Sequence, residues 1–245
     1  MWKFLLFLVA IMITFGNVAS AKSLPKVENV LTHKHTEQCD ATEAEPVQII
    51  CILDRSGSMR SLAEDTIGGY NSFIEKQRQN SSKAEVTTVI FDDRYEKIVD
   101  GIDLQEIPEL TSAEYYARGT TALLDALGKT ITETLGKMEG KKICPAKRRV
   151  LVMIMTDGLE NASKEYKKSE IKSLIEATTK EYKWNYIFIG ANIDSVSEAA
   201  SIGIGRRNAV NYAPTAAGVQ KTFEQMDAAA SEVRESGEVS ENWKK

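Results

Sequence analysis

Short apolar runs alternate along the chain with longer segments in which apolar residues recur every three or four positions. The short runs have the length and the polar flanks of buried strands, and the spaced segments are typical of amphipathic helices. The predicted strands are residues 47–53, 86–91, 95–99, 149–155, 184–189 and, more weakly, 209–212. The predicted helices are residues 62–79, 120–138, 169–182, 196–200 and 216–233.

The order of these elements predicts an α/β fold. Strands that alternate with helices favour a doubly wound, mostly parallel sheet with helices on both faces. Asp92-Asp93-Arg94 is typical of a tight turn, so the third strand is predicted to run antiparallel to the second. We expect one domain over residues 47–236, preceded by a flexible lead-in at 22–46 and followed by a charged tail at 237–245.

Residues 1–21 have the three parts of a secretory signal peptide, namely Lys3, an apolar stretch at 4–15 and the small residues Ala19-Ser20-Ala21. They predict an exported protein that is periplasmic, on the cell surface or secreted. The alternative is an uncleaved membrane anchor, since residues 4–21 approach the shortest bilayer span. Gly16 and Asn17 weigh against that alternative, and no membrane insertion is expected after cleavage.

Charge and histidine content exclude several classes of function. The 31 basic and 35 acidic residues are scattered along the chain, so no clustered positive charge predicts a nucleic-acid partner. His33 and His35 are the two histidines of the chain and both precede the domain, which argues against a histidine-based catalytic triad. We therefore do not expect an enzyme.

Polar residues follow two of the predicted buried strands. Asp54, Ser56 and Ser58 come directly after the first strand, and Thr156-Asp157-Gly158 ends the strand at 149–155. A third polar segment, residues 118–121, opens the helix that precedes this second strand. Because ligands of open α/β sheets bind beyond the carboxyl ends of the strands, we expect these segments to form one site.

The order Asp54-x-Ser56-x-Ser58, then Thr121, then Asp157 resembles the metal-ion-dependent adhesion site of von Willebrand factor A and integrin I domains. The resemblance extends over about residues 47–235, is strongest to bacterial stand-alone members, and implies the strand order 3-2-1-4-5-6. It implies that the three hydroxyl side chains bind a divalent cation, Mg²⁺ or else Mn²⁺ or Ca²⁺, while the two acids hold waters and hydroxyls in place. The family's spacing favours Thr121 over its neighbour Thr120, which would then cap the following helix or support the site.

The resemblance also implies a function. Hydroxyl ligands are neutral, so the cation would keep much of its charge and take an Asp or Glu carboxylate from a partner protein. We expect a metal-dependent adhesion or assembly domain outside the cytoplasm; the alternatives are a metal-assisted hydrolase and a scaffold whose site stays unoccupied. Arg55, Arg118 and Asp92 are candidates for a rim that contacts the partner. The alternatives are a side chain that points away from the cation for Arg55, a surface salt bridge for Arg118, and a turn-forming or site-supporting role for Asp92.

Three cysteines allow at most one internal disulfide. Cys51 lies in an apolar run and is predicted to be buried, whereas Cys39 and Cys144 lie in polar segments of an exported chain. With the implied strand order, these two cysteines precede neighbouring strands at the edge opposite the metal. We therefore predict a Cys39–Cys144 disulfide, which would contribute about 2–4 kcal/mol.

Overall fold

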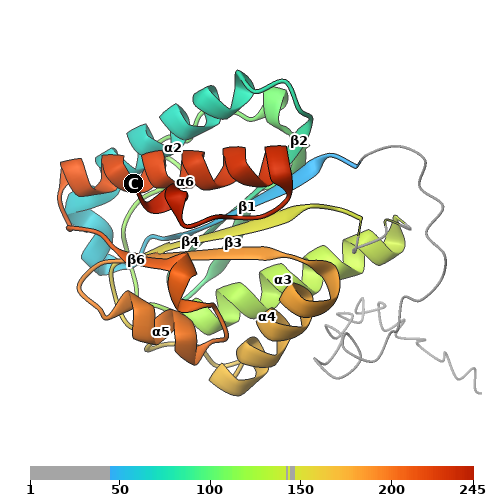
Figure 1. Ribbon diagram of the computed structural model, residues 1–245. Coiled ribbons are helices and arrows are strands. Elements are labelled where there is room, and N and C mark those ends of the chain that lie inside the picture. Colours follow the sequence, from blue (N-terminus) through green and yellow to red (C-terminus); the bar gives the residue numbers. More distant parts are fainter. Residues whose placement is uncertain (1–44, 142, 144–146) are drawn as a thin grey trace, which may run out of the picture.

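The computed structural model describes residues 45–141, 143 and 147–245, and these residues form a layered α/β domain (Figure 1). Their strands make one six-stranded sheet in the order β3-β2-β1-β4-β5-β6. The strands pair in parallel except β3, which runs antiparallel to β2. The predicted doubly wound sheet, its strand order and its antiparallel third strand are confirmed.

The observed elements lie close to the predicted ones. The strands are β1 (Val47–Asp54), β2 (Ala84–Phe91), β3 (Tyr95–Asp103), β4 (Val150–Thr156), β5 (Asn185–Gly190) and β6 (Ala209–Asn211). The α-helices are α2 (Ala63–Arg78), α3 (Leu123–Gly140), α4 (Lys168–Tyr182), α5 (Ser195–Ser201) and α6 (Ala216–Ser236). Short 3-10 turns are η1 (Gly57–Leu62), η2 (Leu104–Glu106), η3 (Arg206–Asn208) and η4 (Asn242–Lys244).

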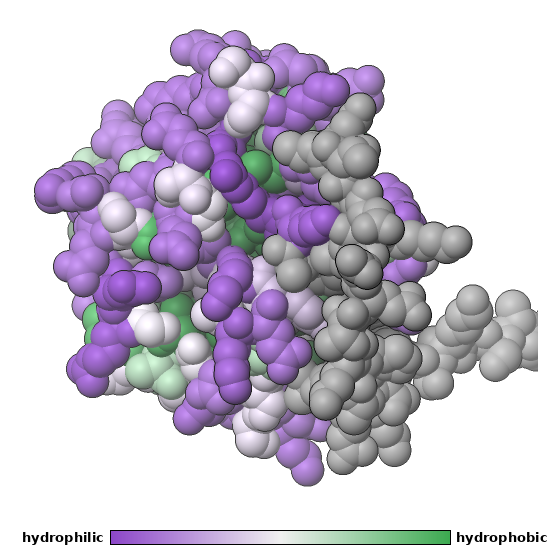
Figure 2. All heavy atoms as spheres, turned by 45° about the vertical axis from the view of Figure 1, so that its right-hand side comes forward, coloured by the Kyte–Doolittle hydropathy of each residue, from purple (hydrophilic) through white to green (hydrophobic). Residues whose placement is uncertain are grey.

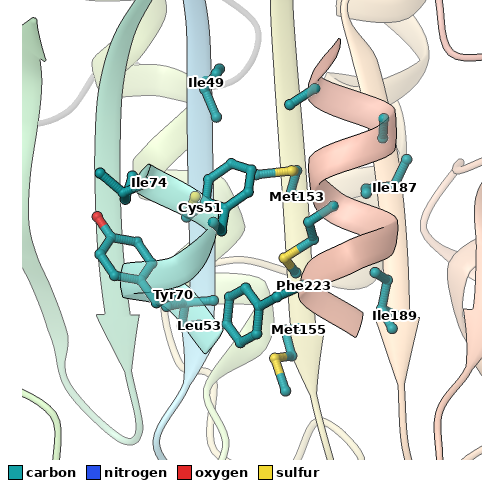
Figure 3. Packing of buried hydrophobic residues seen from close by; sticks show 14 of the residues in the cluster. Ile49, Cys51, Leu53, Tyr70, Ile74, Met153, Met155, Ile187, Ile189 and Phe223 are labelled. Atoms are coloured by element: carbon teal, nitrogen blue, oxygen red, sulfur yellow. The ribbon is translucent and has the colours of Figure 1, made fainter. Parts of the chain in front are cut away.

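The central strands β1 and β4 are buried along their whole length because helices cover both faces of the sheet. Successive side chains of a strand point to opposite faces, so a continuous apolar run contributes side chains to the core on each face of the sheet. Figure 3 shows Cys51 and Leu53 of β1 in the core that lies against Tyr70 of α2 and Phe223 of α6. Ile52 points to the other core, which packs against α3, α4 and α5.

Helix α3 begins at Leu123, three residues later than predicted. The backbone of Thr121 is bonded across to a neighbouring loop: its N–H donates to Asn161 Oδ1 at 3.0 Å, and its carbonyl accepts from the N–H groups of Asn161 and Ala162 at 3.0 and 3.2 Å. These bonds hold Thr121 in the loop rather than in the helix. The difference matters because Thr121 is one of the predicted site residues.

The predicted tail, residues 237–245, packs against the domain. Trp243 is fully buried and Val239 is nearly so, and both belong to the core on the α6 side of the sheet. Gln225 of α6 donates a side-chain hydrogen bond to the carbonyl of Lys244 at 2.9 Å. Val239 and Trp243 are single apolar residues among polar and charged ones, so the hydrophobic pattern did not predict that this segment packs against the domain.

The molecular face seen in Figure 2 is mostly hydrophilic, and its apolar residues are scattered in small patches. No helix within residues 45–141, 143 and 147–245 combines the length and the apolar character needed to cross a bilayer. Cys51 is a buried free thiol, as predicted. The predicted signal peptide at 1–21 and the predicted Cys39–Cys144 disulfide lie outside the described residues.

Candidate metal centre

The first and second polar loops leave the sheet side by side. Strands β1 and β4 are parallel neighbours, with Leu53 opposite Met155, so their carboxyl ends meet at the same edge. At this point Thr156 Oγ1 donates a hydrogen bond of 2.6 Å to Asp54 Oδ2, and Asp54 is fully buried. The carboxylate of Asp54 is therefore fixed where the two loops begin.

Asp54 also shapes the loop that follows it. Its Oδ1 accepts from the backbone N–H of Ser56 at 2.7 Å, the local turn that aspartate side chains favour. The backbone N–H of Met59 donates to the carbonyl of Ser56 at 3.0 Å, and the buried Met59 side chain anchors the turn η1. As a result, the hydroxyl oxygens of Ser56 and Ser58 lie 3.1 Å apart.

Asp157 and Thr121 complete the cluster from the other loops. Ser58 Oγ donates a hydrogen bond of 2.6 Å to Asp157 Oδ1. A Cβ atom placed on Gly158 would lie 3.7 Å from Thr121 Oγ1 and 3.9 Å from Ser58 Oγ, so both hydroxyls lie beside this glycine. The fold thus brings the five predicted residues together at one edge of the sheet.

Of the two adjacent threonines, Thr121 belongs to this cluster. Its side chain is buried, whereas Thr120 is exposed. Within the described part of the chain, no group forms a hydrogen bond with Thr121 Oγ1, which leaves its lone pairs available. The N-cap position of α3 is Ala122, so the first of the two alternatives for Thr120, the capping role, is wrong.

Gly119 allows the third loop to approach the first. Its backbone has a φ of +68°, and a Cβ atom there would lie 2.1 Å from Asp93 Oδ1. Its carbonyl accepts from the N–H of Gly57 at 3.1 Å, and the buried Tyr115 hydroxyl donates to the carbonyl of Asp54. A residue with a side chain would separate these loops, because both the conformation and the space require glycine.

The two acids are held in a desolvated place. Burial raises the pKa of Asp54 to about 6, against the lowering effect of hydrogen bonds from Thr156 and Ser56, and burial also raises the pKa of Asp157. Burial disfavours the ionised form of a carboxyl group, and a nearby cation favours it. A bound cation would therefore stabilise both carboxylates.

The chemistry of the donors fits a hard divalent cation. Three hydroxyls and two carboxylates offer oxygen alone, the ligand type that Mg²⁺, Mn²⁺ and Ca²⁺ prefer. Among the described residues, no group of three or more His, Cys, Asp or Glu side chains is placed to hold a metal. The oxygen donors at this edge suit such a cation by their own chemistry.

Arg55 and Asp92 do not form a rim, and this part of the prediction is wrong. Both side chains are fully buried. Arg55 Nε donates to Asp92 Oδ2 at 3.1 Å and its Nη1 donates to the carbonyl of Glu114 at 3.2 Å. Its Nη2 lies 2.5 Å from Glu96 Oε1, an ion pair without the alignment of a hydrogen bond. Arg55 therefore turns away from the cluster and is neutralised inside the domain.

Arg118 lies at the outer side of this ion-pair cluster, with a quarter of its side chain exposed. Its Nε and Nη2 donate to Asp92 Oδ2 and Glu96 Oε1, each at 2.6 Å. Arg55 and Arg118 hold the pKa of Glu96 below its usual value. The guanidinium carbons of both arginines lie over the ring of Tyr116, 5.5 and 5.3 Å from its centre.

Several residues of this region were not predicted from the sequence. Thr156 and Asn161 fix the loops, and they carried a weak signal as polar residues after a strand. Tyr116 and Leu159 are exposed apolar residues within polar loops, a signal that could have been noticed. Glu96 gave no signal, because only the folded hairpin of β2 and β3 brings it to the two arginines.

The sequence matches no protein-family model and no curated protein, but solved structures share the fold. Proximal thread matrix protein 1 from the mussel byssus matches with a TM-score of 0.53 at 17% identity, over 75% of this chain and 46% of that chain. The structure of this mussel protein with a zinc-occupied MIDAS motif gives 0.53 at 15% identity, over 76% and 48%. A von Willebrand factor type A structure from Catenulispora acidiphila gives 0.51 at 16% identity, over 78% and 43%.

Each match spans less than half of the other chain. At these identities the likeness concerns the fold alone. It agrees with the strand order of the sheet and with the antiparallel position of β3. The chain has the von Willebrand factor A fold.

Proposed function

We propose that this chain is a metal-dependent protein-binding domain. It holds Mg²⁺, or Mn²⁺ or Ca²⁺, and uses the ion to capture an Asp or Glu carboxylate of a partner protein. The observation that carries the proposal is the Ser58 hydroxyl, which donates its hydrogen to Asp157 and lies 3.1 Å from the Ser56 hydroxyl. Because Ser58 gives its hydrogen to Asp157, Ser56 is the donor between the two hydroxyls, and Ser58 keeps a lone pair for a cation.

The residues divide into two roles. Ser56, Ser58 and Thr121 would supply oxygen ligands, since two loops bring their hydroxyls to one place. Asp54 would support the site without contacting the cation directly, because both of its oxygens already accept hydrogen bonds from the protein. Asp157 orients the Ser58 hydroxyl. Ligands held by such partners keep one orientation, which favours metal binding.

Neutral ligands explain why the site would bind a carboxylate. When bound, the cation supplies positive charge at an edge where Arg55 is already paired with Asp92. The zinc-occupied MIDAS motif of the mussel protein shows that this fold holds a divalent ion in another chain. The predicted signal peptide supports a role outside the cytoplasm, in adhesion or in assembly of a complex.

Calorimetric titration of MgCl₂ and MnCl₂ into the full chain tests the metal site. We expect Ser58→Ala to weaken binding at least ~10-fold, because it removes a ligand and the partner of Asp157. Ser61→Ala is the matched control, since Ser61 is exposed in the same turn η1 and should bind the ions as wild type does. Absence of binding in wild type, or equal binding in Ser58→Ala, would contradict the proposal.

Proton relaxation of water by bound Mn²⁺ tests carboxylate capture. A glutamate-containing peptide should displace water from the ion and lower the relaxivity, whereas the same peptide with glutamine should leave it unchanged. Equal effects of the two peptides would show that the carboxylate is not the group recognised.

A further inference from the structure

Exposed apolar side chains gather in the loops of the metal centre. Among the large hydrophobic residues that the structure describes, Tyr116 and Leu159 are the exposed ones, at 44% and 59%. Tyr116 lies five residues before Thr121, and Leu159 lies two residues after Asp157. The other large hydrophobic residues of the described chain are buried or partly buried, so this placement marks one edge of the domain.

The two loops that carry these side chains are bonded to each other. The carbonyl of Thr121 accepts hydrogen bonds from the N–H groups of Asn161 and Ala162, and Asn161 Oδ1 accepts from the Thr121 N–H. The loop of Tyr116 therefore leads into Thr121, and the loop of Leu159 is bonded to Thr121, so both loops flank this candidate ligand.

Tyr116 is held in place before any partner binds. Its ring lies against the guanidinium groups of Arg55 and Arg118, and its hydroxyl accepts a hydrogen bond from Arg118 Nη1 at 3.2 Å. Both arginines are themselves fixed by Asp92 and Glu96. Because the ring is already ordered, its burial under a partner costs little conformational entropy. Tyrosine is one of the residues that dominate binding energy in protein interfaces.

Access to the candidate ligands is restricted. Ser56, Thr121 and Asp157 are almost fully buried, while Ser58 is exposed and Gly158 is half-buried. A carboxylate would have to approach past Ser58 and Gly158, which places the partner next to Leu159. Apolar contacts around such an approach would exclude water and so strengthen the contact between the charges.

We propose that Tyr116 and Leu159 are the apolar rim of the docking surface, and that the partner is a protein loop whose acidic residue is flanked by apolar side chains. This inference rests on the proposed function. It replaces the predicted charged rim by an apolar one, since Arg55 and Asp92 are buried and each nitrogen of Arg118 already donates a hydrogen bond within the protein.

Three synthetic peptides test the rim with the full chain in excess MgCl₂. They are acetyl-Gly-Leu-Glu-Phe-Gly-amide, a version with glycine in place of leucine and phenylalanine, and a version with glutamine in place of glutamate. Wild type should bind the first at least ~10-fold more tightly than the second, because each buried apolar side chain contributes favourably. Equal affinities, or no binding of the first peptide to the Mg²⁺-loaded chain, would overturn the proposed rim.

The variant Tyr116→Ser with Leu159→Ser should reduce this preference to within ~3-fold without changing the Mg²⁺ affinity. Tyr116→Phe keeps the ring and should behave as wild type. A loss of Mg²⁺ binding in wild type would instead refute the proposed function, and glutamine binding as well as glutamate would refute carboxylate capture. Self-association of the wild type that needs Mg²⁺ and is lost in the double variant would identify a second copy as the partner, and would overturn the choice of a different protein.

Discussion

Replacing Asp54 with Asn tests whether the buried carboxylate destabilises the metal-free domain. Burial raises its pKa from 3.8 to about 6, whereas in an unfolded chain it would titrate near ~3.9. The folded state therefore holds the proton more tightly than the unfolded state. Stability should fall as pH rises from about 4 to about 6, and the deficit should persist at higher pH.

The expected size of this effect follows from the pKa difference. A shift of about two pH units corresponds to ~3 kcal/mol above pH 6. Asn keeps an oxygen for the N–H of Ser56, and its amide would face Thr156 Oγ1, a hydroxyl that lies 3.2 Å from the carbonyl of Gly158 and can donate there instead. Loss of the charge-assisted bonds offsets part of the gain, so we expect Asp54→Asn to add about 1–2 kcal/mol to the free energy of unfolding near pH 8 and nothing near pH 4.

Urea unfolding in EDTA, followed by tryptophan fluorescence at several pH values, measures this difference. Glu109→Gln is the control, because Glu109 is exposed and its replacement should change stability by less than about 0.5 kcal/mol at every pH. The reasoning is refuted if Asp54→Asn destabilises the chain near pH 8 as much as near pH 4. In excess Mg²⁺ the wild type should gain stability by mass action, and Asp54→Asn should gain much less.

Three further experiments test the packing of the domain and of its site. Gly119→Ala should lower the free energy of unfolding by about 1–3 kcal/mol in urea melts because of its left-handed backbone, while Gly68→Ala, in open space within α2, should raise it by up to ~1 kcal/mol. Arg55→Met should lower the free energy of unfolding by about 3 kcal/mol, because it removes the buried partner of Asp92. In a double-mutant cycle, Asp92→Asn should restore part of that stability. Burial raises the pKa of the Cys51 thiol to about 12, so peptide mapping should find it unalkylated near pH 8 in the folded chain and alkylated in urea.

The features that were predicted correctly have local causes. Continuous apolar runs such as Val47–Asp54 predict buried strands because both faces of the sheet are covered. The positions of Asp54, Ser56 and Ser58 follow from the strand that ends before them. Alternation of strands and helices, with the resemblance to a known site, was enough for the sheet order.

The features that were missed depend on contacts between distant residues. Arg55 stands between site residues in the sequence, but its direction is decided by Asp92 and Glu96 on the neighbouring hairpin. Trp243 stands alone among charged residues, and only the face of α6 explains its burial. Neither position has a periodic pattern around it, so sequence patterns could not place them.

The position of β1 has a mechanical consequence. The chain enters the described domain at the start of this strand, and the proposed metal ligands Ser56 and Ser58 follow directly after its eight residues. A pulling force between the preceding residues and a captured partner would run along this single length of covalent backbone. To extract β1, the load would have to shear its ladders with β2 and β4 at the same time, which makes the geometry suited to bearing tension.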